Sequence, residues 1–183
     1  MIFIALGANL EHPRWGSPLA TCTAALGALA APDLVPLRRS RWYESAPVPA
    51  SDQPWFVNGI AEFSTGLEPA GLLARLHEVE ADFGRVRGAA NAARVLDLDL
   101  IAFDERVSAP GEVPILPHPR MHERLFVLLP LAELAPAWRH PRLGLGLAEL
   151  IAALPADRAT IRPLLGDSSQ PLASLGRAAY IRQ

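Results

Sequence analysis

The sequence predicts an α+β fold built on a mostly antiparallel sheet. Three observations favour this class: short apolar strands alternate with segments of helical period, two strands stand next to each other between the helices, and the run Arg94–Phe103 alternates polar and apolar residues at its start. Half of the 183 residues are hydrophobic and a fifth are charged, as in ordinary globular proteins. This length suits one domain or at most two.

Hydrophobic period and Gly/Pro punctuation place the elements along the chain. We expect a strand, a helix, two strands, a helix and a strand, then two appended helices, over Ile2–Leu6, 18–31, Leu34–Glu44, Trp55–Ser64, Leu67–Phe83, Arg94–Phe103, Leu125–Leu134 and about 144–153. This order is the split β-α-β pattern of a ferredoxin-like sheet with helices packed on it in α/β/α layers. The last thirty residues mix Pro, Gly and Ser. We therefore expect a domain over residues 1–155 and a loosely ordered extension over 156–183.

Two acids at the start of the alternating strand are the first candidates for a site. Period two places Asp97, Asp99, Ile101 and Phe103 on one face, which begins with two carboxylates and then turns apolar. Like charges at adjacent positions of a partly buried face need a cation, and magnesium beside phosphates is the natural one. The alternative is an amphipathic edge strand with two solvated acids.

Arginines and histidines surround this strand. Gly84-Arg85-Val86-Arg87 precedes it, Arg94 begins it, and Pro117-His118-Pro119-Arg120-Met121-His122-Glu123-Arg124 follows it. The arginine side chain offers a planar fork that matches phosphate oxygens. Metal-holding acids flanked by such forks suit phosphoryl or diphosphoryl transfer. Taken singly, each arginine is better interpreted as a surface cation.

Composition excludes several other classes. All 17 basic residues are arginine, so there is no P-loop lysine and no Schiff-base lysine, and a net charge of −2 argues against a dedicated nucleic-acid binder. Cys22 is the only cysteine, which excludes an intrachain disulfide and a cysteine-rich zinc site. The chain shows neither a secretory signal pattern nor an apolar run of membrane-spanning length, so a cytoplasmic protein without a membrane partner is expected.

Five segments of the chain resemble the 6-hydroxymethyl-7,8-dihydropterin pyrophosphokinase family of folate biosynthesis. They are Ala5-Leu6-Gly7-Ala8-Asn9-Leu10, Asp52-Gln53-Pro54-Trp55-Phe56-Val57-Asn58, Gly84-Arg85-Val86-Arg87, Arg94-Val95-Leu96-Asp97-Leu98-Asp99, and Pro117-His118-Pro119-Arg120-Met121 continuing to Arg124-Leu125-Phe126. They occur in the family's order and near its spacing. The resemblance implies a monomeric enzyme that transfers the terminal diphosphate of ATP to the hydroxymethyl group of a reduced pterin and releases AMP.

The same resemblance implies roles for individual residues. Asp97 and Asp99 are expected to hold two magnesium ions, with Arg85 and Arg94 as the catalytic arginines that approach the phosphates. The residues expected to bind ATP are His77, Glu80, Arg87, His118 and Arg124. Those expected to form the pterin pocket are Ser45, Val48, Phe56, Asn58 and Phe126. An amide at Asn58 can both donate to and accept from a pterin edge, and Phe126 can stack on the bicycle.

The loop Gly88–Ala93 departs from the family pattern, because many relatives carry an Arg-Trp pair there. Two alternatives therefore stay open beside the pterin enzyme. One is a phosphotransferase for another heterocyclic alcohol, and the other is a catalytically silent ferredoxin-like ligand-binding module. We expect the loops over 84–93 and 45–54 to move on binding, because lids of such composition exclude water on closing.

Overall fold

The computed structural model describes residues 1–85, 93–155, 160–168 and 170–172. Its elements are β1 (Ile2–Ala8), α1 (Pro18–Leu29), β2 (Leu34–Arg39), β3 (Tyr43–Ser45), β4 (Phe56–Thr65), α2 (Pro69–Asp82), β5 (Asp97–Phe103), a 3₁₀ turn (Met121–Glu123), α3 (Leu125–Leu134), α4 (Leu147–Ala152), β6 (Ile161–Pro163) and β7 (Gln170–Pro171). The order of strands and helices up to α4 is the predicted one, with one predicted strand divided in two.

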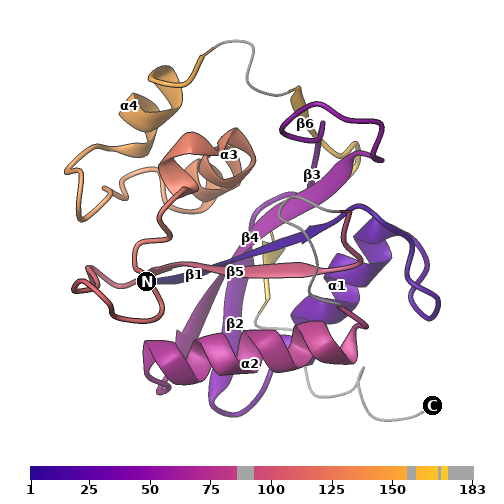
Figure 1. Ribbon diagram of the computed structural model, residues 1–183, viewed down its shortest axis with the longest axis horizontal. Coiled ribbons are helices and arrows are strands. Elements are labelled where there is room, and N and C mark those ends of the chain that lie inside the picture. The colour runs from indigo at the N-terminus through magenta and orange to yellow at the C-terminus, as the bar shows by residue number, and fades with distance from the viewer. Residues whose placement is uncertain (86–92, 156–159, 169, 173–183) are drawn as a thin grey trace.

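The sheet has the strand order β5-β1-β4-β2-β7, and β3 continues beside β4 and pairs with β6 on its other side. All of these pairs are antiparallel. The four strands β5, β1, β4 and β2 thus have the order and direction of a ferredoxin-like fold, which confirms the predicted class. The strand order places β5, which carries the two acids, at one edge of this sheet, next to β1 (Figure 1).

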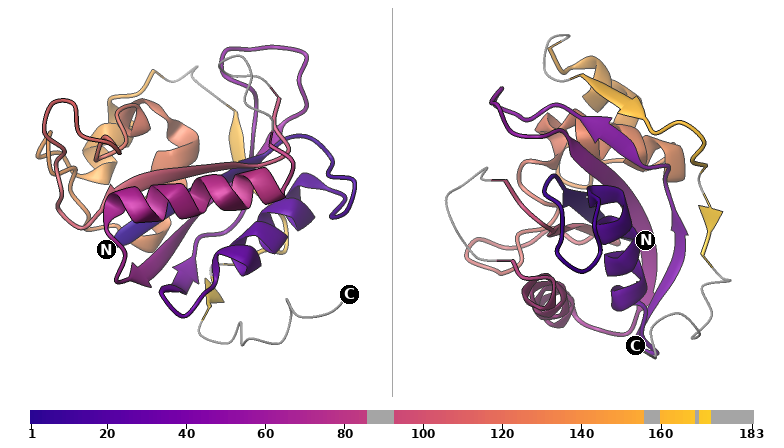
Figure 2. Two further views of the ribbon diagram at one scale, coloured as in Figure 1. Left: turned by 60° about the horizontal axis from the view of Figure 1, so that its bottom comes forward. Right: turned by 90° about the vertical axis from the view of Figure 1, so that its right-hand side faces the viewer.

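Helices cover both faces of the sheet (Figures 1 and 2). One hydrophobic core lies between the sheet and the α1–α2 pair, and a second lies between the sheet and the α3–α4 pair. Along β1, Ile2, Ile4 and Leu6 enter the first core, whereas Phe3 enters the second. Period-two alternation in one strand therefore supplies both cores, as it must in a three-layer protein.

A bulge interrupts the alternation of β5. Consecutive residues of β1 pair with Ala102 and Leu100, which leaves Ile101 as an extra residue. Ile101 and Ala102 both pack on the α3 side, and Phe103 packs on the α1–α2 side. The expectation that Phe103 shares a face with Ile101 is therefore wrong, because one inserted residue inverts every later side chain.

The single strand expected over Leu34–Glu44 is also wrong, because it is divided into β2 and β3. Between the two strands the chain has one more residue than the facing segment of β4, since Arg39 pairs with Ala61 and Tyr43 with Asn58. Ser40 bridges the break: its N–H donates to the carbonyl of Ile60 (2.9 Å), and its Oγ accepts from the Ile60 N–H (3.0 Å). A serine hydroxyl thus replaces a ladder carbonyl where the strand bends.

The described part of the C-terminal extension is more ordered than its composition suggests. β6 pairs with β3 and β7 pairs with β2, so this segment lies along the sheet at Tyr43–Ser45 and at Arg38 and Arg39. The pairing is made by backbone groups, and strands of two or three residues are too short to show a period in sequence.

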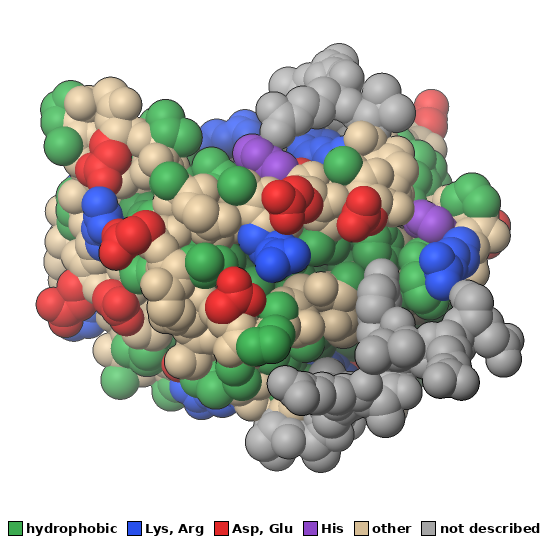
Figure 3. Space-filling model, turned by 90° about the horizontal axis from the view of Figure 1, so that it is seen from below, with side chains coloured by type: hydrophobic (Ala, Val, Ile, Leu, Met, Phe, Trp, Pro, Cys, Tyr) green, Lys and Arg blue, Asp and Glu red, His purple; other side chains and the backbone are tan. Residues whose placement is uncertain are grey.

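The surface seen from the α2 side is mixed in charge. Acidic and basic side chains are separated there by hydrophobic and uncharged ones (Figure 3). Within the described residues, no helix combines the length and the apolar character needed to cross a membrane.

Packing of Trp42 against Gly59 gives a stability prediction. A Cβ on Gly59 would lie 2.6 Å from Cε3 of the buried Trp42 ring, so Gly59→Ala forces the indole to move. We expect a loss of about 1–3 kcal/mol in the free energy of unfolding, measured by urea denaturation. Gly27→Ala in α1 is the control, because its Cβ meets no atom within 4 Å and alanine favours a helix by about 1 kcal/mol. Equal stability of the two variants would contradict this packing account.

Candidate active site

One cavity gathers most of the residues that the sequence singles out. Its volume is about 530 Å³, and it lies beside the first turn of α3, on the sheet face that carries Asp97 and Asp99. The described residues that line it are Gly7, Ser45, Ala46, Pro47, Val48, Pro49, Ser51, Gln53, Phe56, Asn58, Arg85, Arg94, Asp97, Asp99, His118, Arg120, Arg124 and Phe126. Its size is that of a small-molecule site.

A row of paired residues in β5, β1 and β4 lines the cavity and continues to β3 outside it. Asp97 of β5 pairs with Gly7 of β1, Gly7 pairs with Asn58 of β4, and Asn58 pairs with Tyr43 of β3. A Cβ on Gly7 would lie 3.2 Å from the Asn58 Oδ1, which is a tight contact. The glycine thus leaves the space between the acid and the amide open for a ligand.

Arginine side chains balance the charge of both acids. Asp97 forms ion pairs with Nη1 of Arg85 at 2.7 Å and with Nη1 of Arg94 at 2.5 Å. Asp99 pairs with Nη1 of Arg124 at 3.3 Å. The strand is an edge strand, as the alternative interpretation proposed, but its acids are partly buried within a set of arginines rather than simply solvated.

Glu80 of α2 forms an ion pair with Arg85, one of these arginines. This carboxylate is buried at 3 % exposure, although it lies on a helix, and its Oε1 accepts from the Leu98 N–H (2.7 Å) and from Arg85. The Arg85 N–H also donates to the backbone carbonyl of Glu80 (2.9 Å). Glu80 does not line the cavity, so it acts on the site through Arg85 and through the first residues of β5.

The bulge in β5 positions His118. The carbonyl of the extra residue Ile101 accepts from the His118 N–H (2.9 Å), and this brings the imidazole Nε2 to 4.0 Å from Asp99 Oδ2. Burial lowers the pKa of His118; Asp99 opposes this shift, and the Arg124 and Arg120 guanidinium groups add to it. The imidazole is therefore neutral at neutral pH and can both donate and accept a hydrogen bond.

An amide, a hydroxyl and two aromatic rings also line the cavity. The Asn58 Nδ2 donates to the Ser45 Oγ at 2.8 Å, and both side chains are buried. Phe126 lines the cavity from the first turn of α3, and Phe56 lines it from the start of β4. Polar groups and aromatic rings that line the same cavity are suited to a flat heterocycle with hydrogen-bonding edges.

The structure thus brings together most of the predicted site residues but not all of them. His77 is exposed on α2 and does not line the cavity, although it lies one helical turn before Glu80. Arg87 and the loop residues 88–92 lie outside the described residues, as does most of the loop expected to move over 84–93.

Sequence reasoning gave no role to three residues that the structure places at the site. Arg120 and Gln53 line the cavity. Buried Asn9 joins two of its loops, because its Nδ2 donates to Gln53 Oε1 (3.2 Å) and to the Pro54 carbonyl (3.1 Å), and its Oδ1 accepts from the Arg94 N–H (2.8 Å). All three belong to segments that carry the family resemblance. Their position in these segments could have identified them as site residues from the sequence.

The charge of the cavity favours a polyanion. Among the residues that the structure describes, four arginines and two aspartates line it, so positive charge is in excess. Asp97 Oδ1 is buried and, beyond its ion pair with Arg85, accepts no hydrogen bond from the described residues. These residues also contain no group of three or more His, Cys, Asp or Glu that could hold a metal. Two carboxylates are a set that magnesium uses when phosphates complete its coordination.

The fold and the site together define a ferredoxin-like protein with one cavity that is lined by arginines, two carboxylates and aromatic side chains. Residues 3–136 match the family described as 7,8-dihydro-6-hydroxymethylpterin-pyrophosphokinase, which covers well over half of the chain. The chain belongs to this family.

Individual relatives agree with the family match. The 2-amino-4-hydroxy-6-hydroxymethyldihydropteridine pyrophosphokinase of Pseudomonas aeruginosa is 41% identical over 157 residues, which is 85% of this chain and 93% of that protein. The protein of the same name from Synechocystis is 39% identical over 73% of this chain and 69% of its own length. The folic acid synthesis protein fol1 of Pneumocystis carinii is 34% identical over 80% of this chain, which corresponds to 19% of that longer protein.

Removal of the buried carboxylate under the site tests its supporting role. Glu80→Ala leaves the Leu98 N–H and the Arg85 guanidinium without this acceptor, so we expect the free energy of unfolding to fall by about 2–4 kcal/mol in urea denaturation. Asp82→Ala, at an exposed position on the same helix, is the control and should change it by less than about 0.5 kcal/mol. Equal midpoints for both variants would show that Glu80 does not hold Arg85 and β5 in place.

Proposed function

We propose that this protein transfers the terminal diphosphate of ATP to the hydroxymethyl group of 6-hydroxymethyl-7,8-dihydropterin, which gives the pterin diphosphate and AMP in folate biosynthesis. The observation that carries the proposal is the composition of a single cavity in a member of this family. Two carboxylates among arginines line it, together with Ser45, Asn58 and Phe126. We also propose that the enzyme is a monomer and that it acts in the cytoplasm, where ATP is available.

Asp97 and Asp99 are the residues that would hold two magnesium ions with the triphosphate. They are the only carboxylates among the described residues that line the cavity. When bound, the ions neutralise the phosphate oxygens and the charge that develops on the leaving group. In the free protein these acids pair instead with Arg85, Arg94 and Arg124.

The guanidinium groups of Arg85, Arg94 and Arg124 can turn from a carboxylate to a phosphate group. Each reaches an acid through one guanidinium nitrogen, and the guanidinium fork has further N–H groups for an anion. Arg120 adds a fourth guanidinium to the lining. His118, neutral and next to Asp99, can hydrogen-bond to ATP without adding charge. His77 and Arg87 stay proposed contacts to ATP.

The pterin is proposed to lie on the Asn58 side of the cavity. The Asn58 amide can satisfy both a donor and an acceptor on the heterocycle, and its bond to Ser45 fixes its orientation. Phe126 and Phe56 supply aromatic faces, and Val48 lines the same wall. Because Asp97 and Asn58 lie in one cross-strand row with Gly7 between them, a pterin on Asn58 extends its substituent toward the acids.

The reaction needs the two substrates to be aligned rather than covalently activated. The hydroxymethyl oxygen attacks the β-phosphorus of ATP, the bond from that phosphorus to the oxygen shared with the α-phosphate breaks, and AMP leaves with that oxygen. The hydroxyl proton is released as the new bond forms. The cavity would contribute by positioning both substrates and by the excess positive charge of four lining arginines over two acids.

Pterin-dependent formation of AMP tests the proposal directly. Purified protein with ATP and magnesium should release AMP only when 6-hydroxymethyl-7,8-dihydropterin is present, with the pterin diphosphate as co-product, measured by chromatography. Release of ADP would indicate a phosphotransferase with another acceptor. ATP binding without turnover of this pterin would favour a different substrate, and absence of ATP binding would favour the silent ligand-binding module.

Substitution of each acid tests its role in the reaction. Asp97→Asn and Asp99→Asn keep the side-chain shape but remove the charge, so we expect kcat to fall at least about 100-fold in the AMP assay. Asp104→Asn, just beyond the other end of β5, is the matched control because Asp104 pairs with the amino terminus at the surface. Its activity should stay within about twofold of the wild type. Wild-type turnover in either of the first two variants would remove that acid from the metal-binding set.

A further inference from the structure

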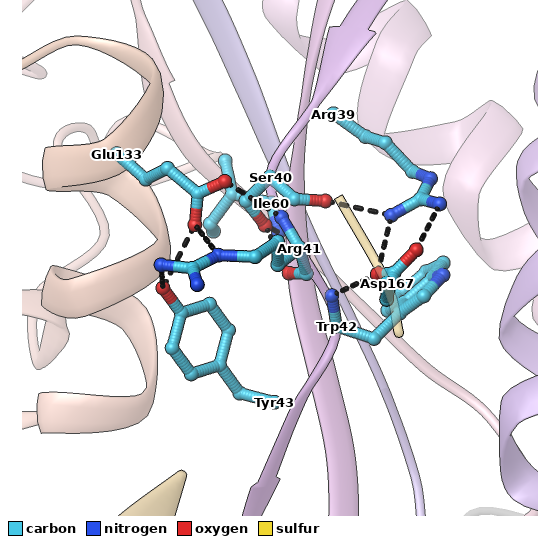
Figure 4. A network of polar contacts seen from close by, with 8 residues as sticks. All are labelled: Arg39, Ser40, Arg41, Trp42, Tyr43, Ile60, Glu133 and Asp167. Atoms are coloured by element: carbon cyan, nitrogen blue, oxygen red, sulfur yellow. Dashed lines mark hydrogen bonds and ion pairs between the residues drawn. The ribbon is translucent and has the colours of Figure 1, made fainter. Parts of the chain in front are cut away.

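Residues 39–43 are held from two sides by carboxylates that come from distant parts of the chain (Figure 4). On one side Glu133 of α3 accepts from the Tyr43 hydroxyl (2.8 Å) and from the Arg41 N–H (3.0 Å). On the other side Asp167, from the C-terminal segment, accepts from the Trp42 N–H (2.7 Å). This is the stretch where β2 ends and β3 begins, so its conformation decides where β3 lies.

Asp167 attaches the C-terminal segment to Arg39 and Trp42. Its two oxygens accept from both terminal nitrogens of Arg39, at 2.8 and 2.7 Å, in a bidentate pair. Only 12 % of the Arg39 side chain and 18 % of the Asp167 side chain are exposed. Burial alone would raise the pKa of Asp167, but the hydrogen bonds from Arg39 and the Trp42 N–H outweigh it and lower the pKa. The carboxylate is therefore charged and firmly paired at neutral pH.

The same segment continues along β3 to the edge of the cavity. β6 pairs with β3 in the register Ser45↔Ile161, and the Ala46 N–H donates to the Thr160 carbonyl (3.0 Å). The Leu164 N–H donates to the Trp42 carbonyl (2.9 Å). Backbone bonds from residues 160–164 thus follow the chain from Trp42 to Ala46.

β3 depends on this pairing because it is short. It has three residues, and it lies between β4 on one side and β6 on the other. Without β6 it would be an edge strand of three residues, and such strands are held weakly. Ser45 at its end accepts from Asn58, and Ala46 lines the cavity next to it. The position of this wall is therefore set by contacts outside the cavity.

We propose that residues 160–167 form a strap that positions the pterin-binding wall, and that Asp167 is the positioning residue that fixes the strap to Arg39 and Trp42. The proposal rests on the proposed function, because it takes the Ser45–Asn58 wall to be the pterin pocket. Asp167 does not line the cavity. The acids and arginines that line the cavity are held by β5, α2 and the segment before α3, and not by the strap. Loosening of the strap should therefore weaken pterin binding selectively.

Asp167→Asn is the variant that loosens the strap, because the amide keeps the shape but loses the charge that pairs with Arg39. Since the binding-competent wall is then only partly populated, we expect the KM and the Kd for the pterin to rise about tenfold. The KM for ATP and kcat at saturation should stay within about twofold, which a general loss of structure would not produce. Asp104→Asn is again the matched control, and Asp167→Glu, which keeps the charge, should restore most of the pterin affinity.

Arg162→Ala is a second, milder variant for the case in which Asp167→Asn does not fold. Arg162 lies on β6 and pairs with Glu44 of β3 at the surface, so its loss should raise the pterin KM about two- to threefold. Each variant is compared in steady-state kinetics and pterin binding at a temperature well below its own Tm. Unchanged pterin affinity in the folded variants would overturn the strap, and so would an equal loss of ATP and pterin affinity. Absence of pterin-dependent AMP in the wild type would instead refute the proposed function, which the wild-type assay alone decides.

Discussion

The ion pairs between two β5 acids and three arginines are the interaction on which this site depends. Asp97 and Asp99 are placed next to each other on one strand face, and like charges this close need positive partners. Arg85, Arg94 and Arg124 supply them from three different segments of the chain, so the pairs also fix the loops that border the cavity. Glu80 extends the same network into the core by holding Arg85. The ion pairs that hold these segments together thus also form the site that we propose for phosphate.

The ferredoxin-like sheet makes this arrangement possible by sharing one face between a core and a cavity. On the α3 side, Phe3, Ile60 and Ile101 lie beneath α3 and α4, and further along the same strands Gly7, Asn58 and Asp97 lie at the cavity. The bulge at Ile101 marks the transition, because its carbonyl holds the His118 segment over the acids. The candidate site therefore lies where the second helical layer ends.

The sequence predicted the elements up to α4 and most of the site, because period, Gly/Pro punctuation and five ordered segments are local features. It missed the bulge at Ile101 and the break at Ser40, since both depend on how many residues a partner strand offers. It also missed Arg120 and Gln53, whose inclusion depends on how distant loops meet. The docking of residues 160–167 was equally hidden, because backbone pairing and one Asp167–Arg39 contact leave no period in the sequence.

We propose that the two acids exchange their arginine partners for metal when the nucleotide binds. The decisive measurement is a crystal structure with magnesium, the pterin and an ATP analogue whose α–β bridging oxygen is replaced by carbon. We expect metal on Asp97 and Asp99, Arg85 and Arg94 turned to phosphate oxygens, and the pterin on Asn58. A nucleotide bound elsewhere, with both acids still paired to their arginines, would refute the exchange.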